Sequence, residues 1–361
     1  MKYRVQALKE YFREEYDGYL VTNPVNLLYF TELIGAPDTL GAAIMLIPKN
    51  DESTLHIYGV NYEWAKAEAK NCTVEQVKSG EDLTKKLAEQ VRRQKVKRLA
   101  FDTMNFQTHR RFSEAMKRAE RLEEKSEYVW NLRRVKDQDE LKAMQKAADL
   151  TMVGMQAAHD TIEAGLREIE VAAEIEYAMR THGSYGLAFE TSVASGPRSA
   201  YPHGGCGEHK IRKGNAVVVD IGARYRNYCA DMTRTFTVGK PSTKQEKIYA
   251  LVERAQEEAF RKIHEGARAA DVDGVARKII EKAGYSEHFV HGLGHGIGLE
   301  VHEQPNLSSV SKDVLKAGNM VTDEPGVYIV GFGGFRIEDT VFVRKGKAKR
   351  LTEGLRFLGK K

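Results

Sequence analysis

The chain has few cysteines, no long apolar run and no strong excess of one charge. Its three cysteines, Cys72, Cys206 and Cys229, lack paired spacing, which argues against a disulfide framework and favours a reducing compartment. No run approaches the length of a membrane span, and residues 1–8 hold no apolar core of signal-peptide length. We therefore expect a cytoplasmic protein with no membrane partner.

The charge balance argues against a nucleic-acid partner. The chain has 56 Lys and Arg against 51 Asp and Glu, a net charge of +5, and the two signs are interleaved, so no basic stripe stands out. A hydrophobic share of 42% and a charged share of 30% are typical of a globular protein. The length of 361 residues is enough for two domains, each with its own core.

The first third of the chain alternates short apolar strands with helical stretches. This pattern predicts a small α/β domain over residues 1–125. Strands are expected at 19–21, 42–47, 54–58 and 99–101, and a helix with one apolar face at 83–91.

The pattern changes at Asp137. Asp137 followed by Glu140 is typical of a helix-capping box, and apolar residues, several of them methionines that we interpret as core, then recur at helical spacing up to Gly165. We predict a linker at 126–136 and a second, mixed α and β domain over 137–361. Its further helices are expected near 168–183, 242–266 and 273–284.

Four carboxylates of this second part lie in or beside apolar runs. Asp220 closes the run 216–220, and Asp231, Glu324 and Glu338 have similarly apolar or strand-like surroundings. A single such residue is usually a partly exposed strand end. Four of them, with the glycine-flanked His295 between, indicate a metal site, because a buried carboxylate is costly without a cation or hydrogen bonds. The sequence therefore predicts one two-metal centre.

The spacing of the acids suggests how they meet. We interpret 224–227 as a hairpin turn centred between residues 225 and 226, which would place Asp220 opposite Asp231. Opposed side chains have Cβ atoms about 4.5–5.5 Å apart, which suits ions about 3.5–4 Å apart. A second hairpin centred on Gly331 would pair Glu324 with Glu338 in the same way. A slip of one residue would turn a ligand to the other face.

The glycine-rich run 292–298 has a second interpretation. Spaced glycines also occur in dinucleotide-binding loops, but these need a strand before and a helix after. Here a helix is expected before the run and a strand over 299–302 after it. We favour a role for the small residues in letting the backbone and His295 approach an ion.

These motifs together resemble the metallopeptidase family of prolidase, aminopeptidase P and methionine aminopeptidase. The order Asp, Asp, His, Glu, Glu matches the ligand order of that family, and the N-terminal part more weakly resembles the creatinase/prolidase N-terminal domain. Methionine aminopeptidases usually lack such a domain, so the prolidase and aminopeptidase P branch fits better. The motifs that carry the resemblance are 219–223, 230–235, 291–298, 324–328 and 336–339.

The resemblance implies a "pita-bread" catalytic domain with two divalent metal ions. Asp231 and Glu338 are expected to bridge the ions, with Asp220 on one and His295 and Glu324 on the other. An oxygen-rich ligand set suits Mn²⁺ or Co²⁺. Two cations lower the proton affinity of bound water, and Glu324 is expected to take the proton.

The resemblance also implies roles for residues around the metals. His203 and His302 match histidines expected to stabilise the tetrahedral intermediate and the departing group. His291, Tyr328 and Arg336 match positions near the substrate. Without the resemblance, each histidine would pass for a surface or core residue, Tyr328 for an ordinary strand tyrosine and Arg336 for a surface arginine. Thr233 is a weaker candidate, placed to orient a metal-bound carboxylate.

The expected function is cleavage of the peptide bond preceding proline, by an Xaa-Pro dipeptidase (prolidase). An aminopeptidase P acting on longer Xaa-Pro peptides is the alternative within the family. A non-catalytic peptide-binding or scaffold protein of the same fold is the alternative of another class, and a metal-free creatinase-like enzyme conflicts with the intact ligand set. The expected partners are proline-containing dipeptides or short peptides, and the resemblance implies a homodimer.

The chain departs from the family pattern at two positions. Asp323 stands where a hydrophobic residue usually precedes Glu324, which puts metal affinity in doubt. Asn306 stands near Pro305, where many relatives have an arginine or an aromatic residue, which puts in doubt how the C-terminus of the substrate is held.

Overall fold

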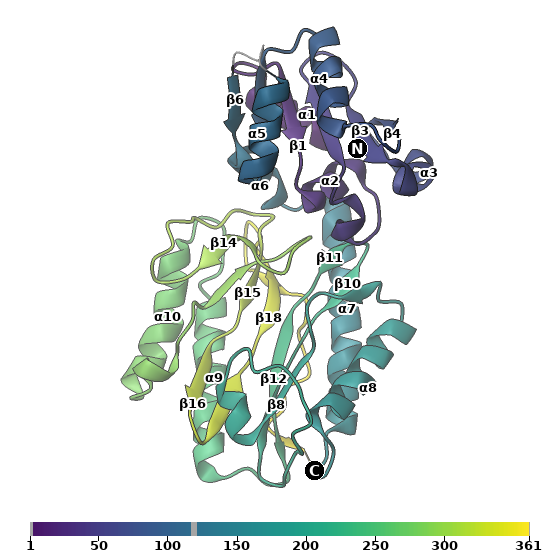
Figure 1. The fold of residues 1–361 in the computed structure, drawn as a ribbon. Coiled ribbons are helices and arrows are strands. Elements are labelled where there is room, and N and C mark those ends of the chain that lie inside the picture. The colour runs from purple at the N-terminus through teal and green to yellow at the C-terminus, as the bar shows by residue number, and fades with distance from the viewer. Residues whose placement is uncertain (1–2, 117–120, 361) are drawn as a thin grey trace. The chain divides into compact units, whose positions relative to one another are not determined.

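The chain forms two compact units, Met1–Arg133 and Arg134–Lys361. The structure is a computed structural model that describes residues 3–116 and 121–360. Both units combine helices and strands (Figure 1), which confirms the predicted mixed α/β class. Residues 126–133, part of the expected linker, form helix α6 (Ser126–Arg133).

Unit 1 is built on a six-stranded sheet in the order β4-β3-β2-β1-β5-β6. β2 runs antiparallel to β1 and β3, and the other neighbours are parallel. The four predicted strands and the predicted helix 83–91 are confirmed to within two residues, whereas β4 and β6 were not predicted. The strands are β1 (Gly18–Val21), β2 (Ile44–Pro48), β3 (Thr54–Tyr58), β4 (Thr73–Val77), β5 (Arg98–Phe101) and β6 (Arg121–Glu124).

Helices cover both faces of this sheet. The apolar faces of α4 and α5 share one core with Leu20, Leu46 and Leu99 of the strands. On the opposite face, Tyr19 stacks on Phe12 of α1, as the two-residue alternation of a strand requires. The helices of unit 1 besides α6 are α1 (Tyr3–Phe12), α2 (Pro24–Thr31), η1 (Pro37–Leu40), α3 (Gly59–Glu68), α4 (Leu83–Arg93) and α5 (Phe106–Ala115).

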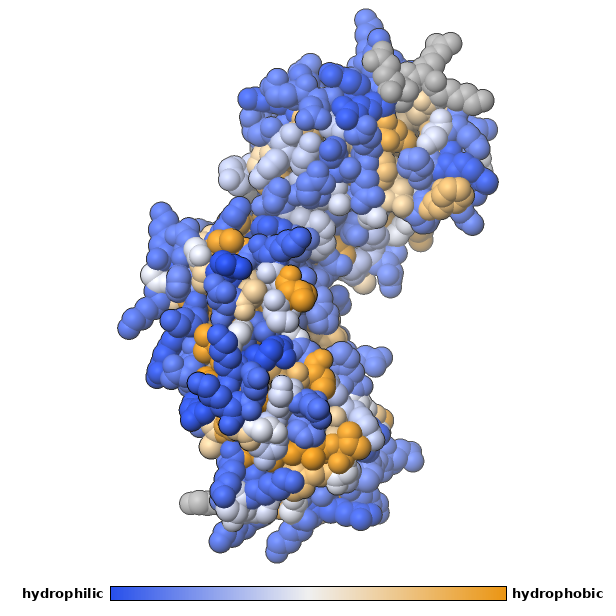
Figure 2. All heavy atoms as spheres, turned by 90° about the vertical axis from the view of Figure 1, so that its left-hand side faces the viewer, coloured by the Kyte–Doolittle hydropathy of each residue, from blue (hydrophilic) through white to orange (hydrophobic). Residues whose placement is uncertain are grey.

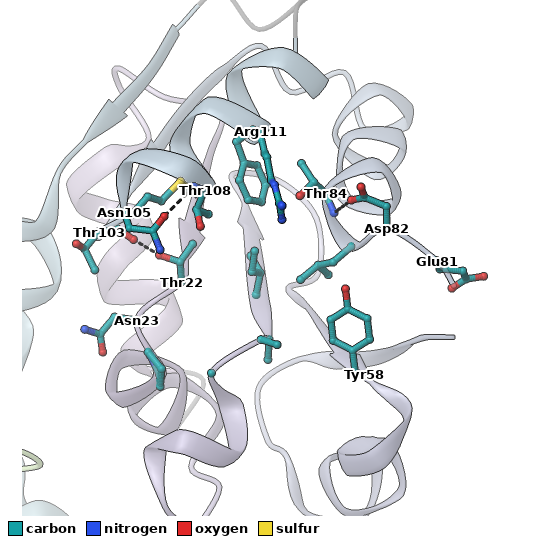
Figure 3. Close-up of a pocket in the computed structure, with 18 of the residues that line it drawn as sticks. Thr22, Asn23, Tyr58, Glu81, Asp82, Thr84, Thr103, Asn105, Thr108 and Arg111 are labelled. Atoms are coloured by element: carbon teal, nitrogen blue, oxygen red, sulfur yellow. Dashed lines mark hydrogen bonds between the residues drawn. The ribbon is translucent and has the colours of Figure 1, made fainter. Parts of the chain in front are cut away.

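A cavity of about 670 Å³ lies at the ends of the strands of unit 1 (Figure 3). It lies beyond the ends of β1, β3 and β5 and beside the first turns of α4 and α5. The buried Asp102 carboxylate accepts hydrogen bonds from the backbone N–H groups of Thr22, Asn23 and Thr103, and so fixes the loops that border the cavity.

Unit 2 holds two helix pairs, each packed on its own strands (Figure 1). The pair α7 and α8 shares a core with β8, β9 and β12. The pair α9 and α10 shares another core with β14 to β18. The helices are α7 (Gln138–Thr161), α8 (Glu168–Thr181), η2 (Gly196–Ala200), α9 (Thr243–Phe260), α10 (Ala269–Lys282) and η3 (Ser286–His288).

The strands of unit 2 form several small sheets. Their orders are β20-β12-β9-β8, β14-β13-β15-β18-β19, β11-β10-β7 and β16-β17. The strands are β7 (Gly186–Leu187), β8 (Ser192–Ser195), β9 (Ala216–Ile221), β10 (Ala223–Tyr225), β11 (Tyr228–Cys229), β12 (Met232–Val238), β13 (Gly294–Gly296), β14 (Glu303–Leu307), β15 (Met320–Asp323), β16 (Gly326–Ile329), β17 (Gly333–Arg336), β18 (Asp339–Phe342), β19 (Lys349–Arg350) and β20 (Gly359–Lys360).

The predicted start of α7 is confirmed. Asp137 and Glu140 form the reciprocal capping box, in which the Asp137 side chain accepts from the Glu140 N–H and the Glu140 side chain accepts from the Asp137 N–H. Met144 and Met155 are fully buried, which confirms their assignment to the core.

Two predictions of secondary structure in unit 2 were wrong. The helix expected to reach residue 266 ends at Phe260, because Lys262 and Ile263 donate to carbonyls only three residues back and so form tighter turns. Residues 299–302 are not a strand: the Glu303 carboxylate accepts from the N–H groups of Leu299 and Glu300 and holds a bend there.

The surface is mostly hydrophilic. On the face drawn in Figure 2, hydrophobic residues form small groups among hydrophilic ones, as is usual for globular proteins. Within the described residues, no helix is both long enough and apolar enough to cross a membrane.

Candidate metal centre

Three of the five predicted ligands form a compact cluster. One ligand atom from each of Asp231, His295 and Glu338 lies within 4.8 Å of the others. Asp231 lies between β11 and β12, His295 lies within β13, and Glu338 lies between β17 and β18. The cluster thus joins three segments of the chain, of which the first and the last are more than one hundred residues apart.

The other two predicted ligands flank this cluster. Glu324 Oε1 lies 3.2 Å from His295 Nε2, which in turn lies 3.8 Å from Asp231 Oδ2. Asp220 receives a 2.5 Å hydrogen bond from Arg336 Nη2. All five residues line one cavity of about 560 Å³ in unit 2, so the structure brings the predicted set together.

The first hairpin does not have the predicted register. Asp220 lies opposite Thr233 in the β9–β12 ladder, two positions beyond Asp231. The turn is centred one residue later than expected, because Arg226 and Asn227 take its left-handed positions at φ 46° and 70°. A shift of two residues leaves each side chain on the same face of the sheet, and the acids still line the same cavity.

The second hairpin has the predicted register. Asp323 pairs with Asp339 and Gly326 with Arg336, so the hairpin is centred on Gly331. Between these pairs, the Glu338 N–H donates to the Thr233 carbonyl at 3.0 Å, which joins the second hairpin to the first. The Glu324 N–H donates to the Leu293 carbonyl at 2.9 Å, which joins it to the glycine-rich run.

The glycines of that run are required by close packing. A Cβ atom on Gly294 would lie 2.2 Å from the Thr322 carbonyl oxygen, and one on Gly296 would lie 2.4 Å from the Gln304 backbone. Gly294 and Gly296 belong to strand β13, which contributes His295 to the cluster. A dinucleotide loop opening a helix is therefore ruled out for this run.

Several carboxylate oxygens of the cluster are buried without a hydrogen-bond partner among the described residues. They are Asp220 Oδ1, Asp231 Oδ1 and Glu338 Oε1. Burial, followed by the charge of Asp220 for Asp231 and of Asp231 for Glu338, raises the pKa of both carboxyl groups. Added positive charge would favour the ionised forms of both groups, and divalent cations fit this donor set.

His295 and Glu324 are electrostatically linked. Burial opposes the charge on each, but their hydrogen bond and mutual attraction raise the pKa of His295 to about 9 and lower that of Glu324 to about 2. The backbone N–H of His295 and the Oε1 of Glu324 both contact the Thr322 hydroxyl, at 3.0 Å each. Thr322, which the sequence analysis missed, thus fixes both residues.

A second set of hydrogen bonds supports the acids. Thr233 donates to Glu338 at 2.5 Å, and Arg336 Nε donates to the Thr233 hydroxyl at 3.0 Å. Arg336 also donates to the Tyr328 hydroxyl, which lies 2.9 Å from His291 Nε2. Arg336 is buried, not a surface residue, and Tyr328 lies behind the cavity wall.

The three predicted histidines differ in their surroundings. His291 is largely enclosed, and burial lowers its pKa. His302 is exposed at the cavity wall, 4.2 Å from the ring centre of His295, and partial burial followed by the charge of His295 lowers its pKa. His203 is also exposed at the wall.

The family model for metallopeptidase family M24 matches residues 142–345, and that for the Creatinase/Prolidase N-terminal domain matches residues 4–135. The chain belongs to metallopeptidase family M24. This confirms the resemblance and fold class inferred from the motifs, and it makes the chain a hydrolase whose family implies divalent metal ions.

Similar proteins of the M24 family carry related names. A Pyrococcus furiosus protein named Xaa-Pro dipeptidase is 37% identical over 355 residues, covering 98% of each chain. The structure of an Xaa-Pro dipeptidase from Bacillus anthracis has a TM-score of 0.92 at 34% identity and covers 99% of both chains. An X-Pro aminopeptidase from Thermotoga maritima has a TM-score of 0.87 at 34% identity, covering 95% of this chain and 97% of that one.

The two departures from the M24 pattern lie outside the cavity wall. Asp323 is fully buried behind Glu324, and burial, only partly offset by the charge of Arg350, raises its pKa. Asn306 is exposed on β14, and its backbone N–H donates to Asp313. Neither side chain lines the cavity that holds the cluster.

Sequence analysis missed part of the cavity wall. These residues precede the metal motifs or lie between them. Only Ser192 could have been placed in the site from strand pairing, because it lies opposite Asp220 in the β8–β9 pair. They are Phe189, Glu190, Ser192, Pro202 and Val301. The cavity of unit 1, though larger, has no histidine among its lining residues, and its two carboxylates, Glu81 and Asp82, are exposed.

Proposed function

We propose that the chain is an Xaa-Pro dipeptidase that hydrolyses the bond preceding proline. The observation that carries this proposal is the one cavity lined by Asp220, Asp231, His295, Glu324 and Glu338, in which three buried carboxylate oxygens have no hydrogen-bond partner among the described residues. The names of the full-length relatives support the substrate class. A non-catalytic protein of this fold would have no need of the intact set.

The cavity residues would hold two divalent ions, Mn²⁺ or Co²⁺. Asp231, His295 and Glu338, whose ligand atoms lie within 4.8 Å of one another, would hold them, together with the flanking Asp220 and Glu324. Such ions polarise a carbonyl oxygen and lower the pKa of bound water. Hard oxygen donors and one imidazole favour these metals over ions that prefer thiolates.

The remaining chemistry belongs to the chain. Glu324, whose Oε1 lies 3.2 Å from His295 at the cavity wall, offers a carboxylate that can accept a proton. His302, with its lowered pKa, is neutral and offers one N–H to the developing oxyanion. The proline nitrogen has no N–H and must be protonated to leave. His203, also on the cavity wall, is placed to assist that departure.

An aminopeptidase P activity is the second candidate, supported by the likeness to the Thermotoga maritima structure. The test is to load metal-free protein with Mn²⁺ or Co²⁺ and to offer Met-Pro and Met-Pro-Ala in parallel. We expect rapid release of proline from the dipeptide only. Cleavage of the tripeptide would favour aminopeptidase P, and cleavage of neither would refute both.

Three further expectations are part of this proposal. The chain is expected to be a homodimer, which sedimentation velocity would test, and to lie in the cytoplasm, which fractionation of cells would test. Residues 137–361 are proposed as the catalytic domain and 1–125 as the N-terminal domain, joined by 126–136. Limited proteolysis of the full chain would test that division.

A further inference from the structure

Glu190 differs from the other acids of the catalytic cavity. Five carboxylates line the cavity, and four of them are the clustered Asp220, Asp231, Glu324 and Glu338. Glu190, the fifth, is exposed and has no hydrogen-bond or ion-pair partner among residues 3–116 and 121–360. The cavity wall therefore carries one negative charge that the predicted metal ligands do not account for.

Glu190 lines the same cavity as the cluster but is not part of it. Ser192 lies directly opposite Asp220, and Glu190 precedes Ser192 by two residues. Glu190 is exposed, whereas Asp231 and Glu338 are buried, so its carboxylate lies toward the open side of the cavity, where the outer part of a substrate would reach.

The cavity that Glu190 lines also has apolar wall residues. Phe189 and Val301 line the same cavity, and Phe189 packs so closely on Gly222 that a Cβ atom there would lie 2.7 Å from its ring. Lysine and arginine bury a hydrocarbon stem against such surfaces while the charged head reaches a polar partner. An apolar wall ending in a free carboxylate fits that kind of side chain.

We propose that Glu190 is a specificity-determining residue that favours substrates with lysine or arginine before proline. The inference rests on the proposed Xaa-Pro dipeptidase activity. The N-terminal ammonium of the substrate is a poorer candidate for Glu190. It lies one carbon from the scissile carbonyl and therefore close to the clustered acids, whereas the Lys or Arg head extends away from them.

The test compares Lys-Pro, Met-Pro and Glu-Pro as substrates of the metal-loaded full chain. Lysine and methionine have unbranched side chains of similar length, so their kcat/KM ratio isolates charge. In the unaltered protein we expect Lys-Pro to exceed Met-Pro about 1.4- to fivefold, the range for a largely exposed ion pair, with Glu-Pro poorest. In E190Q the ratio of kcat/KM for Lys-Pro to that for Met-Pro should fall to about one, and in E190K Glu-Pro should overtake Lys-Pro.

Glu174 supplies the matched control. It is an exposed acid on α8 and is not among the residues that line the catalytic cavity, so E174Q removes the same charge elsewhere in unit 2. We expect E174Q to keep the Lys-Pro to Met-Pro ratio. An equal loss for all three dipeptides in E190Q would assign Glu190 to the substrate ammonium and overturn the proposal, as would an unchanged ratio. Failure to cleave any dipeptide would instead refute the proposed function.

Discussion

Thr233 donates a 2.5 Å hydrogen bond to Glu338, although the two residues are 105 positions apart. In the ladder of β9 and β12, the residue opposite Asp220 is Thr233 and not Asp231 as expected, so a hydroxyl lies across from this acid. The same hydroxyl accepts from Arg336, which binds Asp220. One threonine thereby orients two acids of the cluster.

Replacing this hydroxyl should weaken metal binding. In Thr233→Val the shape is kept, but Glu338 and Arg336 each lose a partner. We expect Mn²⁺ affinity, measured by isothermal titration, to fall about 10- to 100-fold, as is typical for residues that orient metal ligands. Thr233→Ser retains the hydroxyl and should recover most of the affinity. Equal affinities for the valine and serine variants would contradict this role.

Removing the charge of Asp231 should abolish turnover while preserving the fold. Asp231→Asn keeps the side-chain shape but removes a central acid of the cluster, and several kcal/mol of transition-state stabilisation would be lost with the metals. We expect kcat/KM for Met-Pro to fall at least about 1000-fold, with a near-native far-UV circular dichroism spectrum. Asp271→Asn, an exposed acid on α10, is the control and should remain active. Retained turnover in the Asp231 variant would remove it from the ligand set.

A buried ion pair holds the bend that presents His302. Lys136 Nζ lies 2.8 Å from Glu303 Oε2 with both side chains 1% exposed, and the other oxygen of Glu303 accepts from Leu299 and Glu300. We expect Lys136→Met to destabilise the protein by about 3–5 kcal/mol in urea unfolding, because it leaves a buried charge unpaired.

The partner variant makes this test specific. Glu303→Gln in the Lys136→Met background removes the unpaired charge but keeps an oxygen for the two backbone amides. The double variant should therefore be more stable than Lys136→Met alone. If it is less stable, the cost comes from lost packing around Lys136 and not from the unpaired carboxylate.

Metal affinity should rise with pH. Burial raises the pKa of Asp231 and Glu338, so both hold their protons to higher pH than ordinary carboxyl groups, and hydrogen bonding and the nearby acids raise the pKa of His295 to about 9 despite its burial. Metals bind the deprotonated forms and must displace those protons. We expect Mn²⁺ affinity to increase about tenfold per pH unit for each proton displaced between pH 6 and 8.

Calorimetry in two buffers of different ionisation enthalpy would count the displaced protons directly. Glu338→Gln, which has no titrating proton at that position, should release fewer protons than the unaltered protein. Equal affinities at pH 6 and pH 8 would show that the groups are already deprotonated, and would contradict the expected direction.

Local sequence signals were sufficient where a short segment decides its own structure. The capping box at Asp137 and Glu140 was predicted because its two hydrogen bonds lie within one helical turn. The second hairpin was predicted because its glycine-rich turn marks the centre. The first hairpin was misplaced because Arg226, with its positive φ, does not look like a turn residue that favours the left-handed region.

The sequence by itself determined the family, the order of the five candidate ligands and most of the elements that carry them, because these are properties of short motifs. Only the tertiary structure decided that Thr322 contacts both His295 and Glu324, that Lys136 reaches Glu303, and that Glu190 has no partner among the residues that the structure describes. Such contacts join segments whose spacing along the chain holds no record of their meeting. They are fixed by how the two hairpins and the glycine-rich strand pack together in three dimensions.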